Sequence, residues 1–273
     1  MLEWVRLRAA STREDLMAQA KVVSPPHKLG FLATLRTDAW WIEPAVTAIS
    51  LAIFFGWLGV SVFLDQWHFE AGPYISPVFE PKLFEANSSV FITPALVVLL
   101  GPIPFRATCY YYRRAYYRSW FMAPPACAVG DAGGAYRGEV GFPLILQNLH
   151  RFAMYGALVF VPILWWGAIR SFYHDGEIGL GLGSVILVVN AYLLMMYTFS
   201  CHSLRHWVGG GLDCFSCSKV TRARKRLWDR VSLWNVNHRL FAWSSLIWIV
   251  FTDVYIRLVA NGHITDPNTW SRF

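Results

Sequence analysis

The stretch IGLGLGSVILVVNAYLLMMYTFSCHSL, residues 178–204, decides the fold, because it runs for 27 residues without a charge when His202 is counted as neutral. A helix needs about 20 apolar residues to cross the hydrocarbon core of a bilayer. This stretch is therefore predicted to be a transmembrane helix. Residues 44–64 form a second uncharged run, of 21 residues, and are predicted to cross the membrane as well.

Three weaker segments predict further crossings. Residues 88–105 and 152–169 are uncharged runs of 18 residues each. Residues 240–260 begin with 13 uncharged residues and then contain Asp253 and Arg257, which lie one helical turn apart and are expected to pair near an interface. The sequence thus predicts an all-α integral membrane bundle of about five transmembrane helices.

The order of the segments predicts one membrane domain, residues 44–260, between an N-terminal segment, residues 1–43, and a tail, residues 261–273. The chain has 55% hydrophobic and only 15% charged residues, too few charges to cover a soluble protein of 273 residues. Arg, Lys, Asp and Glu interrupt the N-terminal segment throughout, so a cleaved signal peptide is not expected.

The basic residues predict the orientation of the chain. Six precede the first span, five lie in residues 106–137 and eight lie in residues 205–239, whereas the other loops hold almost none. Because cytoplasmic loops are rich in Lys and Arg, the N-terminus and these two loops are predicted to be cytoplasmic. The tail is then extracytoplasmic, in a multi-pass plasma-membrane protein. This pattern also explains the net charge of +7, so nucleic acid is not an expected partner.

Prolines and aromatic residues mark the second span and the loop after it. Pro94, Pro102 and Pro104 interrupt the span and predict a bent helix. The loop begins with Cys109-Tyr-Tyr-Tyr-Arg-Arg-Ala-Tyr-Tyr-Arg-Ser-Trp120, in which aromatic residues alternate with Arg. That composition is typical of an anchor at the membrane interface, and also of a docking surface for a soluble partner.

The stretch most informative about chemistry is Cys201-His202-Ser-Leu-Arg-His206-Trp-Val-Gly-Gly-Gly-Leu-Asp-Cys214-Phe-Ser-Cys217. If the helix continues, His202 and His206 lie one turn apart on one face, where both imidazoles reach a single metal. The triple glycine then allows the chain to reverse, and Cys214-x-x-Cys217 has the spacing with which two thiolates hold iron or zinc. Two imidazoles and two thiolates are therefore predicted to converge near the cytoplasmic face.

Several identities are open for this site. A disulfide is disfavoured, because the predicted topology places the cysteines on the reducing cytoplasmic side. Two His and two Cys fit tetrahedral zinc and also a Rieske-type [2Fe-2S] centre. The position favours iron-sulfur, because a redox centre at the mouth of a membrane domain can reach a lipid-soluble quinone. Without a metal, Cys201 would be a small buried residue and the histidines satisfied interface residues.

Haem b is the competing cofactor. His150 opens the third predicted span and His238 the fifth, at the same depth as His202 and His206. Imidazole pairs between helices hold b-type haem, so these four residues are the candidates for its axial ligands. All of them lie at the cytoplasmic end, and a haem is expected only there.

The phrase from Cys201 to Cys217, together with five spans and histidines at their cytoplasmic ends, resembles the cytochrome b-like membrane anchor of actinobacterial succinate dehydrogenase. Three later phrases resemble the last helix of the same family: Trp234-Asn-Val-Asn-His238, Phe241-Ala-Trp-Ser-Ser245 and Asp253-Val-Tyr-Ile-Arg257. The resemblance covers most of the chain from about Trp40.

The resemblance implies a subunit of a succinate:quinone oxidoreductase, without catalytic residues or dehydrogenase activity of its own. A flavoprotein would oxidise succinate, and an iron-sulfur protein would relay the electrons. The anchor would hold both at the bilayer and deliver the electrons to menaquinone, in a complex with room for a further small membrane subunit. Many family members carry haem b. Cys214-x-x-Cys217 departs from that pattern and is similar to a haem-free variant with a Rieske-type cluster.

The resemblance also implies site residues. Four side chains are expected to ligate the cluster, namely His202, His206, Cys214 and Cys217. Two alternates are Cys201 and His238. A quinone site needs an apolar slot with hydrogen-bond donors near the headgroup layer. The nearest suitable groups, equally typical of interfacial anchors, are Arg205, Trp207, Ser232 and His238.

Two other classes of protein are weighed against this one. A metal-dependent membrane desaturase or hydroxylase needs repeated short-spaced His boxes, and the sequence has one pair of that spacing. A transporter places ionisable groups at mid-bilayer, and the first four predicted spans offer none. A zinc-stabilised membrane scaffold without a redox role stays open.

Overall fold

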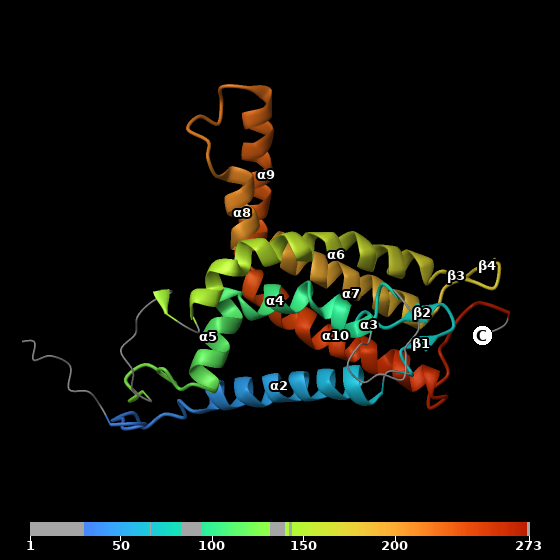
Figure 1. The fold of residues 1–273 in the computed structure, drawn as a ribbon, viewed down its shortest axis with the longest axis horizontal. Coiled ribbons are helices and arrows are strands. Elements are labelled where there is room, and N and C mark those ends of the chain that lie inside the picture. Colours follow the sequence, from blue (N-terminus) through green and yellow to red (C-terminus); the bar gives the residue numbers. More distant parts are fainter. Residues whose placement is uncertain (1–29, 66, 83–93, 132–139, 142–143, 272–273) are drawn as a thin grey trace, which may run out of the picture.

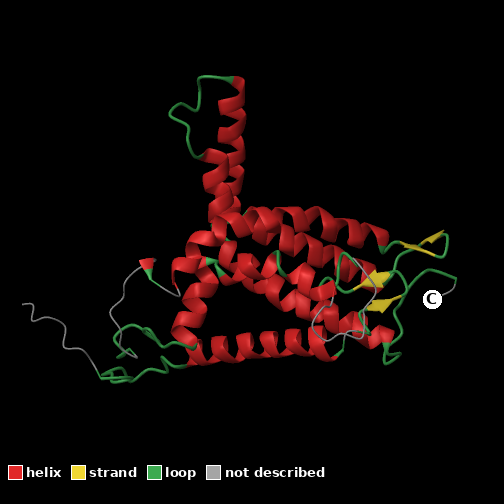
Figure 2. Cartoon of the chain, viewed as in Figure 1, coloured by secondary structure: helices red, strands yellow, loops and turns green. Residues whose placement is uncertain are grey.

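The structure is a computed structural model in which residues 30–65, 67–82, 94–131, 140–141 and 144–271 are described. Figure 1 shows an elongated bundle of helices with one helical hairpin standing out from its side. Apart from two short strand pairs, the regular structure of the described residues is helical (Figure 2). The predicted all-α membrane bundle is confirmed.

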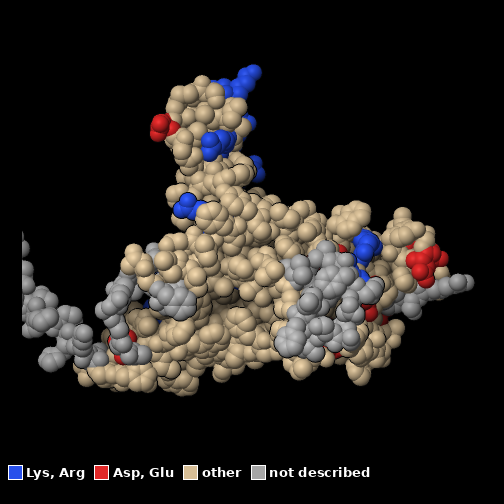
Figure 3. All heavy atoms as spheres, in the orientation of Figure 1, with Lys and Arg blue, Asp and Glu red and all other residues tan. Residues whose placement is uncertain are grey.

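Among the described residues, four apolar helices are each long enough to cross a membrane. They are α2 (Ile42–Gly59, extended by a π-helical turn over Val60–Leu64), α6 (His150–Arg170), α7 (Leu182–Phe199) and α10 (His238–Ala260). They correspond to the first, third, fourth and fifth predicted spans, so α10 forms in spite of its charged residues. In Figure 3 the visible surface of the bundle is almost free of charged side chains between its two ends.

The second predicted span, residues 88–105, is described only in part. From residue 94 on it consists of two short helices, α3 (Pro94–Leu99) and α4 (Pro102–Ala107), and not of one continuous helix. The break directly precedes Pro102, whose ring removes a backbone donor and blocks the continuation of a helix. After α2, the short helices α3 and α4 lead the chain back along the bundle to α5 (Figure 1). The chain therefore follows the predicted order of crossings.

Shorter elements lie at the two ends of the bundle. At one end, α5 (Tyr110–Ser119) packs against α2, and a 3-10 helix (Leu144–Leu149) leads into α6. At the other end, two short strand pairs are antiparallel. They are β1 (Glu70–Ala71) with β2 (Tyr74–Ile75), and β3 (Tyr173–His174) with β4 (Glu177–Ile178).

The hairpin that stands out from the bundle consists of α8 (His202–Gly209) and α9 (Lys219–Asn235). It begins earlier than the uncharged run predicts, because α7 ends at Phe199 and does not continue to residue 204. The sulfur of Cys201 accepts the backbone N–H of Ser203 at 3.3 Å and thereby caps α8 as a new helix. The predicted chain reversal at the triple glycine is confirmed, with Gly211 at a φ of +68°.

A buried ion pair ties α10 to the end of α2. Asp253 is fully buried and accepts hydrogen bonds from Trp57 Nε1 at 2.8 Å and Ser61 Oγ at 2.9 Å. Its Oδ2 atom also lies 3.0 Å from Arg257 Nε, so the predicted pairing of these two residues is confirmed. Arg257 in turn reaches the carboxylate of Asp65 at 2.8 Å. Because lipid offers no hydrogen bonds, such groups have to be satisfied inside the protein, as they are here.

The Asp253 network predicts a large effect on stability. Asp253→Leu is expected to lower the free energy of unfolding by about 3 kcal/mol, because it leaves the buried guanidinium of Arg257 without one of its two carboxylate partners. Unfolding of the purified protein in detergent measures the change. The control is Asp229→Leu, which breaks the exposed pair of Asp229 with Lys225 and is expected to cost less than about 1 kcal/mol. Equal losses in the two variants would contradict a special role for Asp253.

Candidate metal centre

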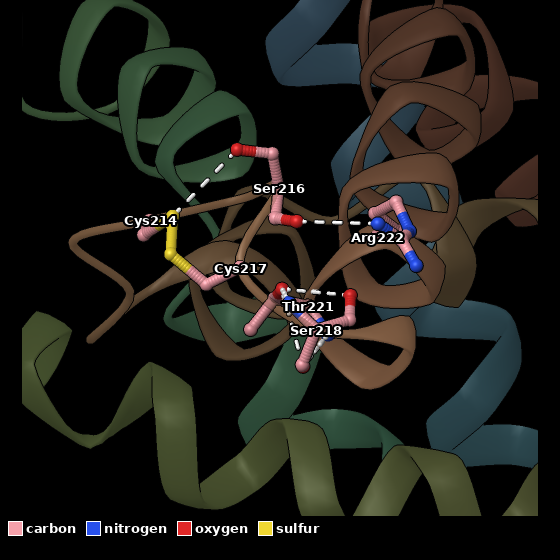
Figure 4. Close-up of a disulfide and its surroundings, with 6 residues drawn as sticks. All are labelled: Cys214, Ser216, Cys217, Ser218, Thr221 and Arg222. Atoms are coloured by element: carbon pink, nitrogen blue, oxygen red, sulfur yellow. Dashed lines mark hydrogen bonds between the residues drawn. A yellow bond between two sulfur atoms is a disulfide. The ribbon is translucent and has the colours of Figure 1, made fainter.

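The four side chains predicted to ligate a cluster all lie on the α8–α9 hairpin. His202 and His206 are exposed on α8 with ring centroids 5.3 Å apart, so the predicted pair on one helix is confirmed. Cys214 and Cys217 lie in the loop between α8 and α9, where they form a disulfide bond (Figure 4). The expectation that these two cysteines would not form a disulfide is therefore wrong.

The two histidines and two cysteines of the hairpin do not form one site. Each sulfur is bonded to the other, so neither is a free thiolate that holds iron or zinc. The loop also has its own hydrogen bonds, because Ser218 caps α9 together with Thr221, and Arg222 donates to the carbonyl of Ser216 at 3.3 Å (Figure 4). These contacts hold the loop at the tip of the hairpin, whereas His202 lies at its root. The predicted convergence of the four is thus corrected.

A second set of two histidines and two cysteines meets at the root of the hairpin. The Nε2 atom of His150, the first residue of α6, lies 3.2 Å from Sγ of Cys201. The Nε2 atom of His238, the first residue of α10, lies 3.6 Å from Sγ of Cys109. Both sulfurs are free thiols, and all but the half-buried His150 are buried. This set contains both predicted alternates, Cys201 and His238, and two of the four histidines that are candidates for haem ligands, His150 and His238.

All four side chains line one cavity, which has a volume of 250 Å³. The cavity reaches the surface at the end of the bundle, because exposed residues such as Asn148 and His202 belong to its lining. Further lining residues come from the segments beside α5 and α6, and include Thr108, Tyr111, Arg113 and Gln147. The set is therefore buried within the protein but lies beside an opening that a partner or solvent can reach.

Two hydroxyl groups decide which ring nitrogen of each histidine carries the proton. Thr108 Oγ1 donates to a main-chain carbonyl one turn earlier at 2.6 Å, so it accepts the hydrogen of His150 Nδ1, 2.9 Å away. Ser200 Oγ likewise donates to a main-chain carbonyl at 3.2 Å and accepts from His238 Nδ1 at 2.7 Å. Each Nε2 is then unprotonated, and its lone pair faces the neighbouring cysteine. Both imidazoles are thus set to act as metal ligands through Nε2.

Aromatic rings hold both imidazoles in place. Phe105 stacks on His150 with ring centroids 4.8 Å apart, and Tyr197 stacks on His238 at 5.1 Å. Phe105 and Tyr197 also contact each other at 5.2 Å, so the four rings form one continuous row across the bundle. A ligating imidazole needs a fixed orientation, and these contacts provide it.

Both buried cysteines lie at the N-terminal cap of a helix, Cys109 before α5 and Cys201 before α8. The positive end of a helix dipole stabilises a thiolate at this position. Burial acts in the opposite direction, since it raises the pKa of the Cys201 thiol to about 11 and also raises the pKa of Cys109. Both are therefore neutral thiols at pH 7, and a metal has to displace two protons in order to bind.

In the buried set each imidazole lies beside one thiol, whereas a Rieske-type centre holds one iron with two imidazoles and the other with two thiolates. In the part of the chain that the structure describes, no three His, Cys, Asp or Glu side chains surround one ion position. In a Rieske-type [2Fe-2S] centre, each iron takes only two protein ligands, and the four ligands together are two imidazoles and two thiolates. The buried set of Cys109, Cys201, His150 and His238 has this composition.

Three of the four residues predicted to bind quinone make contacts within the hairpin or between the hairpin and the bundle. Arg205 Nε donates to Ser232 Oγ at 2.8 Å, which links α8 to α9. Trp207 contacts Tyr155 of α6 edge to face, with ring centroids 6.5 Å apart. The fourth residue, His238, belongs to the buried set.

An apolar slot of 110 Å³ lies beside the buried set, between α2, α4, α5 and α10. Its walls are mostly aliphatic and aromatic side chains, among them Leu51, Phe54, Phe55, Ile103, Trp120 and Leu246. Its polar groups are Arg106, Tyr112 and Tyr116. The Arg106 guanidinium donates to Tyr112 Oη at 2.6 Å and lies 4.7 Å from the ring centre of Tyr197, which stacks on His238. Arg106 of the slot and the ring of Tyr197 therefore connect the slot to His238 of the buried set.

Cys109 is the one member of the buried set that the sequence pattern does not single out as a ligand. The only sequence feature that points to Cys109 is its predicted depth in the membrane. Like His150, Cys201 and His238, it lies where a predicted span meets the cytoplasmic side. Residues far apart in sequence meet at that depth because the crossings alternate in direction.

Comparisons with known proteins relate the whole chain to one family. The family model described as actinobacterial succinate dehydrogenase subunit SdhC matches residues 42–262. Among solved structures, a chain of the Mycobacterium smegmatis Sdh1 complex in the apo form is similar, with a TM-score of 0.80 and 39% sequence identity. That match covers 90% of this chain and 97% of the other. A search of curated proteins found no match.

The burial of the cysteines predicts the order in which they react with a maleimide. In the native protein, exposed Cys127 is expected to react, whereas buried Cys109 and Cys201 react only after denaturation. Cys214 and Cys217 should need a reductant first, because their disulfide blocks them. Mass spectrometry of labelled peptides checks each step. Labelling of Cys109 or Cys201 in the native protein would contradict the buried site.

Proposed function

The chain belongs to the actinobacterial succinate dehydrogenase subunit SdhC family, and from this premise we propose that it anchors a succinate dehydrogenase at the membrane and passes its electrons to menaquinone. The proposed partners are a flavoprotein that oxidises succinate and an iron-sulfur subunit that relays the electrons, with room for a further small membrane subunit. The multi-pass bundle of apolar helices supports the role of the anchor.

The observation that carries the redox part of the proposal is the buried set of two imidazoles and two thiols. Cys109, Cys201, His150 and His238 are the proposed ligands of a Rieske-type [2Fe-2S] cluster. When bound, such a cluster supplies a one-electron carrier whose potential is raised by its His ligands. This ligand set replaces His202, His206, Cys214 and Cys217, and retains the type of cofactor.

The chain's own residues prepare the site for that cofactor. Thr108 and Ser200 fix the proton on Nδ1 of their histidines, which leaves both Nε2 atoms free to bind metal. The Ser203 N–H donates to the Cys201 sulfur at 3.3 Å, and hydrogen bonds to sulfur stabilise added negative charge on a cluster. Phe105 and Tyr197 exclude water from the inner side of the site by stacking on the two imidazoles.

Haem b is the alternative cofactor for the same residues. His150 and His238 line one cavity and come from different helices, as axial ligands do. However, each Nε2 atom lies beside a thiol, at 3.2 Å and 3.6 Å. Thiol neighbours favour an iron-sulfur cluster, and an absorption spectrum separates the two cofactors by the presence or absence of a Soret band.

The apolar slot beside the site is the proposed position of the menaquinone headgroup. An apolar lining with a few polar groups suits a quinone, whose two carbonyl oxygens accept hydrogen bonds. Arg106 and Tyr116 lie in the lining, where Arg106 donates to Tyr112 and Ser245 and Tyr116 donates to the carbonyl of Ala107. The apolar walls of the slot are therefore the observation that supports this proposal. Arg106 contacts the ring of Tyr197, which stacks on His238, and this chain of contacts is the proposed route of electrons from the cluster to the slot.

The iron-sulfur subunit is proposed to dock at the opposite side of the site. The 250 Å³ cavity reaches the surface next to the buried ligands, with polar residues such as Gln147, Asn148 and His202 in its lining. A docked subunit would close this opening and bring its own redox centre near His150 and Cys201. Electrons would then enter from the cytoplasmic side and leave towards the lipid side.

The cluster is tested by electron paramagnetic resonance of the dithionite-reduced complex. Wild-type protein is expected to show a Rieske-type signal, and Cys109→Ser and Cys201→Ser are each expected to abolish it, because each removes a thiolate ligand. The matched control is the double variant Cys214→Ser/Cys217→Ser, which removes two cysteines from the hairpin tip and is expected to keep the signal.

Co-purification of the soluble subunits shows whether each cysteine variant is folded. A folded complex of Cys201→Ser that keeps the full Rieske-type signal would overturn the ligand assignment. Loss of the signal in the double variant alone would return the site to the hairpin. A Soret band with no Rieske-type signal in wild-type protein would replace the cluster by haem.

The quinone slot is tested by narrowing it. Ile103→Phe is expected to raise the KM for a menaquinone analogue about tenfold, because overpacking an apolar site costs about 1–3 kcal/mol. The cluster signal should stay unchanged, since Ile103 does not contact the ligands. The control is Ile49→Phe on the outer surface of α2, where the side chain is 60% exposed and the KM should not change. An unchanged KM for Ile103→Phe would place the quinone elsewhere.

A further inference from the structure

The α8–α9 hairpin lies in an orientation that is unusual for a cytoplasmic loop. It stands out sideways from the end of the bundle, and the long helices α6 and α7 run across its direction (Figure 1). Contacts of α8 with α6 and of α9 with α7 form its root. Because the long helices cross the bilayer, a hairpin in this direction runs along the membrane surface. Its many basic residues place that surface on the cytoplasmic side.

One face of α9 carries a stripe of apolar residues. Val220, Leu227 and Trp234 are seven residues apart, so they lie within about 40° of one another around the helix. Trp234 stacks on Phe199, the last residue of α7, with ring centroids 6.3 Å apart. This contact fixes the direction of the whole stripe towards the membrane helices. Further out on the same face, Val220 is 69% and Leu227 49% exposed.

The neighbouring helix of the hairpin carries an aromatic side chain on the same side. Trp207 of α8 contacts Tyr155 of α6, with ring centroids 6.5 Å apart. Tyr155 is itself 44% exposed on the outer surface of α6, together with Phe152 and Val159. The apolar side of the hairpin is therefore continuous with the surface that α6 presents to lipid.

The charges of α9 complement an anionic surface. The helix holds six basic residues and one acidic residue. Asp229 is paired with Lys225, and Arg224 donates to main-chain carbonyls of α8, so these groups act within the hairpin. Arg226 and Arg230 are exposed, and they lie about 100° and about 60° around the helix from Leu227. Arg side chains in this position reach lipid phosphates while the stripe enters the acyl boundary.

We infer that the α8–α9 hairpin lies flat in the cytoplasmic headgroup layer, with Arg226 and Arg230 bound to the phosphates of anionic phospholipids. The apolar stripe begins at a membrane helix and continues the lipid-facing surface of the bundle. We therefore expect lipid, and not a soluble subunit, to cover the stripe. A subunit that docks from the cytoplasm meets the other side of the hairpin. Figure 3 shows Lys and Arg gathered on the hairpin, next to an apolar surface of the bundle that is almost free of them. The inference does not depend on the identity of the cofactor.

A photoreactive side chain tests what covers the stripe. In the intact complex in nanodiscs of phosphatidylglycerol and phosphatidylcholine, Leu227→p-benzoylphenylalanine is expected to cross-link to lipid, which mass spectrometry detects. The matched control is Arg222→p-benzoylphenylalanine on the opposite side of α9, which should not label lipid. Cross-linking of position 227 to another protein subunit, or equal lipid labelling at both positions, would overturn the inference.

Lipid retention tests the charges. Native mass spectrometry of the complex is expected to show tighter binding of phosphatidylglycerol than of phosphatidylcholine. Arg226→Gln/Arg230→Gln should weaken phosphatidylglycerol binding about fivefold for each charge removed and leave phosphatidylcholine unchanged. Lys82→Gln/Arg170→Gln removes the same charge at the other end of the bundle and should have no effect. Unchanged retention in the Arg226/Arg230 variant would refute the assigned phosphate contacts.

Discussion

Two hydrogen bonds, from His150 Nδ1 to Thr108 and from His238 Nδ1 to Ser200, fix the buried histidines at the end of the bundle from which the α8–α9 hairpin leaves. Each hydroxyl has already used its own hydrogen on a main-chain carbonyl, so it can only accept. The proton of each imidazole is therefore held on Nδ1, and Nε2 is left as a base that faces a thiol. Thr108 and Ser200 both occupy short breaks between helices, α4 to α5 and α7 to α8. Without those breaks neither hydroxyl would lie beside its histidine.

Polar side chains at both ends of α10 find hydrogen-bond partners inside the protein, and the partners differ between the two ends. Polar groups at membrane depth have to find partners in the protein, because lipid supplies none. At the inner end, His238 is satisfied by Ser200 and lies beside Cys109. At the outer end, Asp253 is satisfied by groups of α2 and by Arg257. Helix α10 is thus fixed against α7 at one end and α2 at the other, which keeps the inner ligands in register with the rest of the bundle.

The crossings could be predicted from sequence because an uncharged run of about 20 residues has few alternatives to a membrane helix. The predicted bend of the second span follows from its prolines, but the end of α7 at Phe199 does not, since the uncharged run continues to residue 204. The site was harder to predict. Cys214 and Cys217 are close to His202 in sequence, yet the hairpin separates them, while the buried ligands come from four places in the chain. Only their shared depth, at the cytoplasmic ends of the spans, carries a signal for Cys109.

The geometry also gives the proposed electron route a direction. On one side of the buried set, the 250 Å³ cavity has a polar and exposed lining, which suits a soluble partner but not a quinone. On the other side, the 110 Å³ slot is almost wholly apolar and lies against α2, which suits a quinone that arrives from the bilayer but not a soluble partner. Arg106 of the slot contacts the ring of Tyr197, which stacks on His238 of the buried set. A redox centre between these two openings can exchange electrons with a soluble subunit on one side and with a quinone in the bilayer on the other.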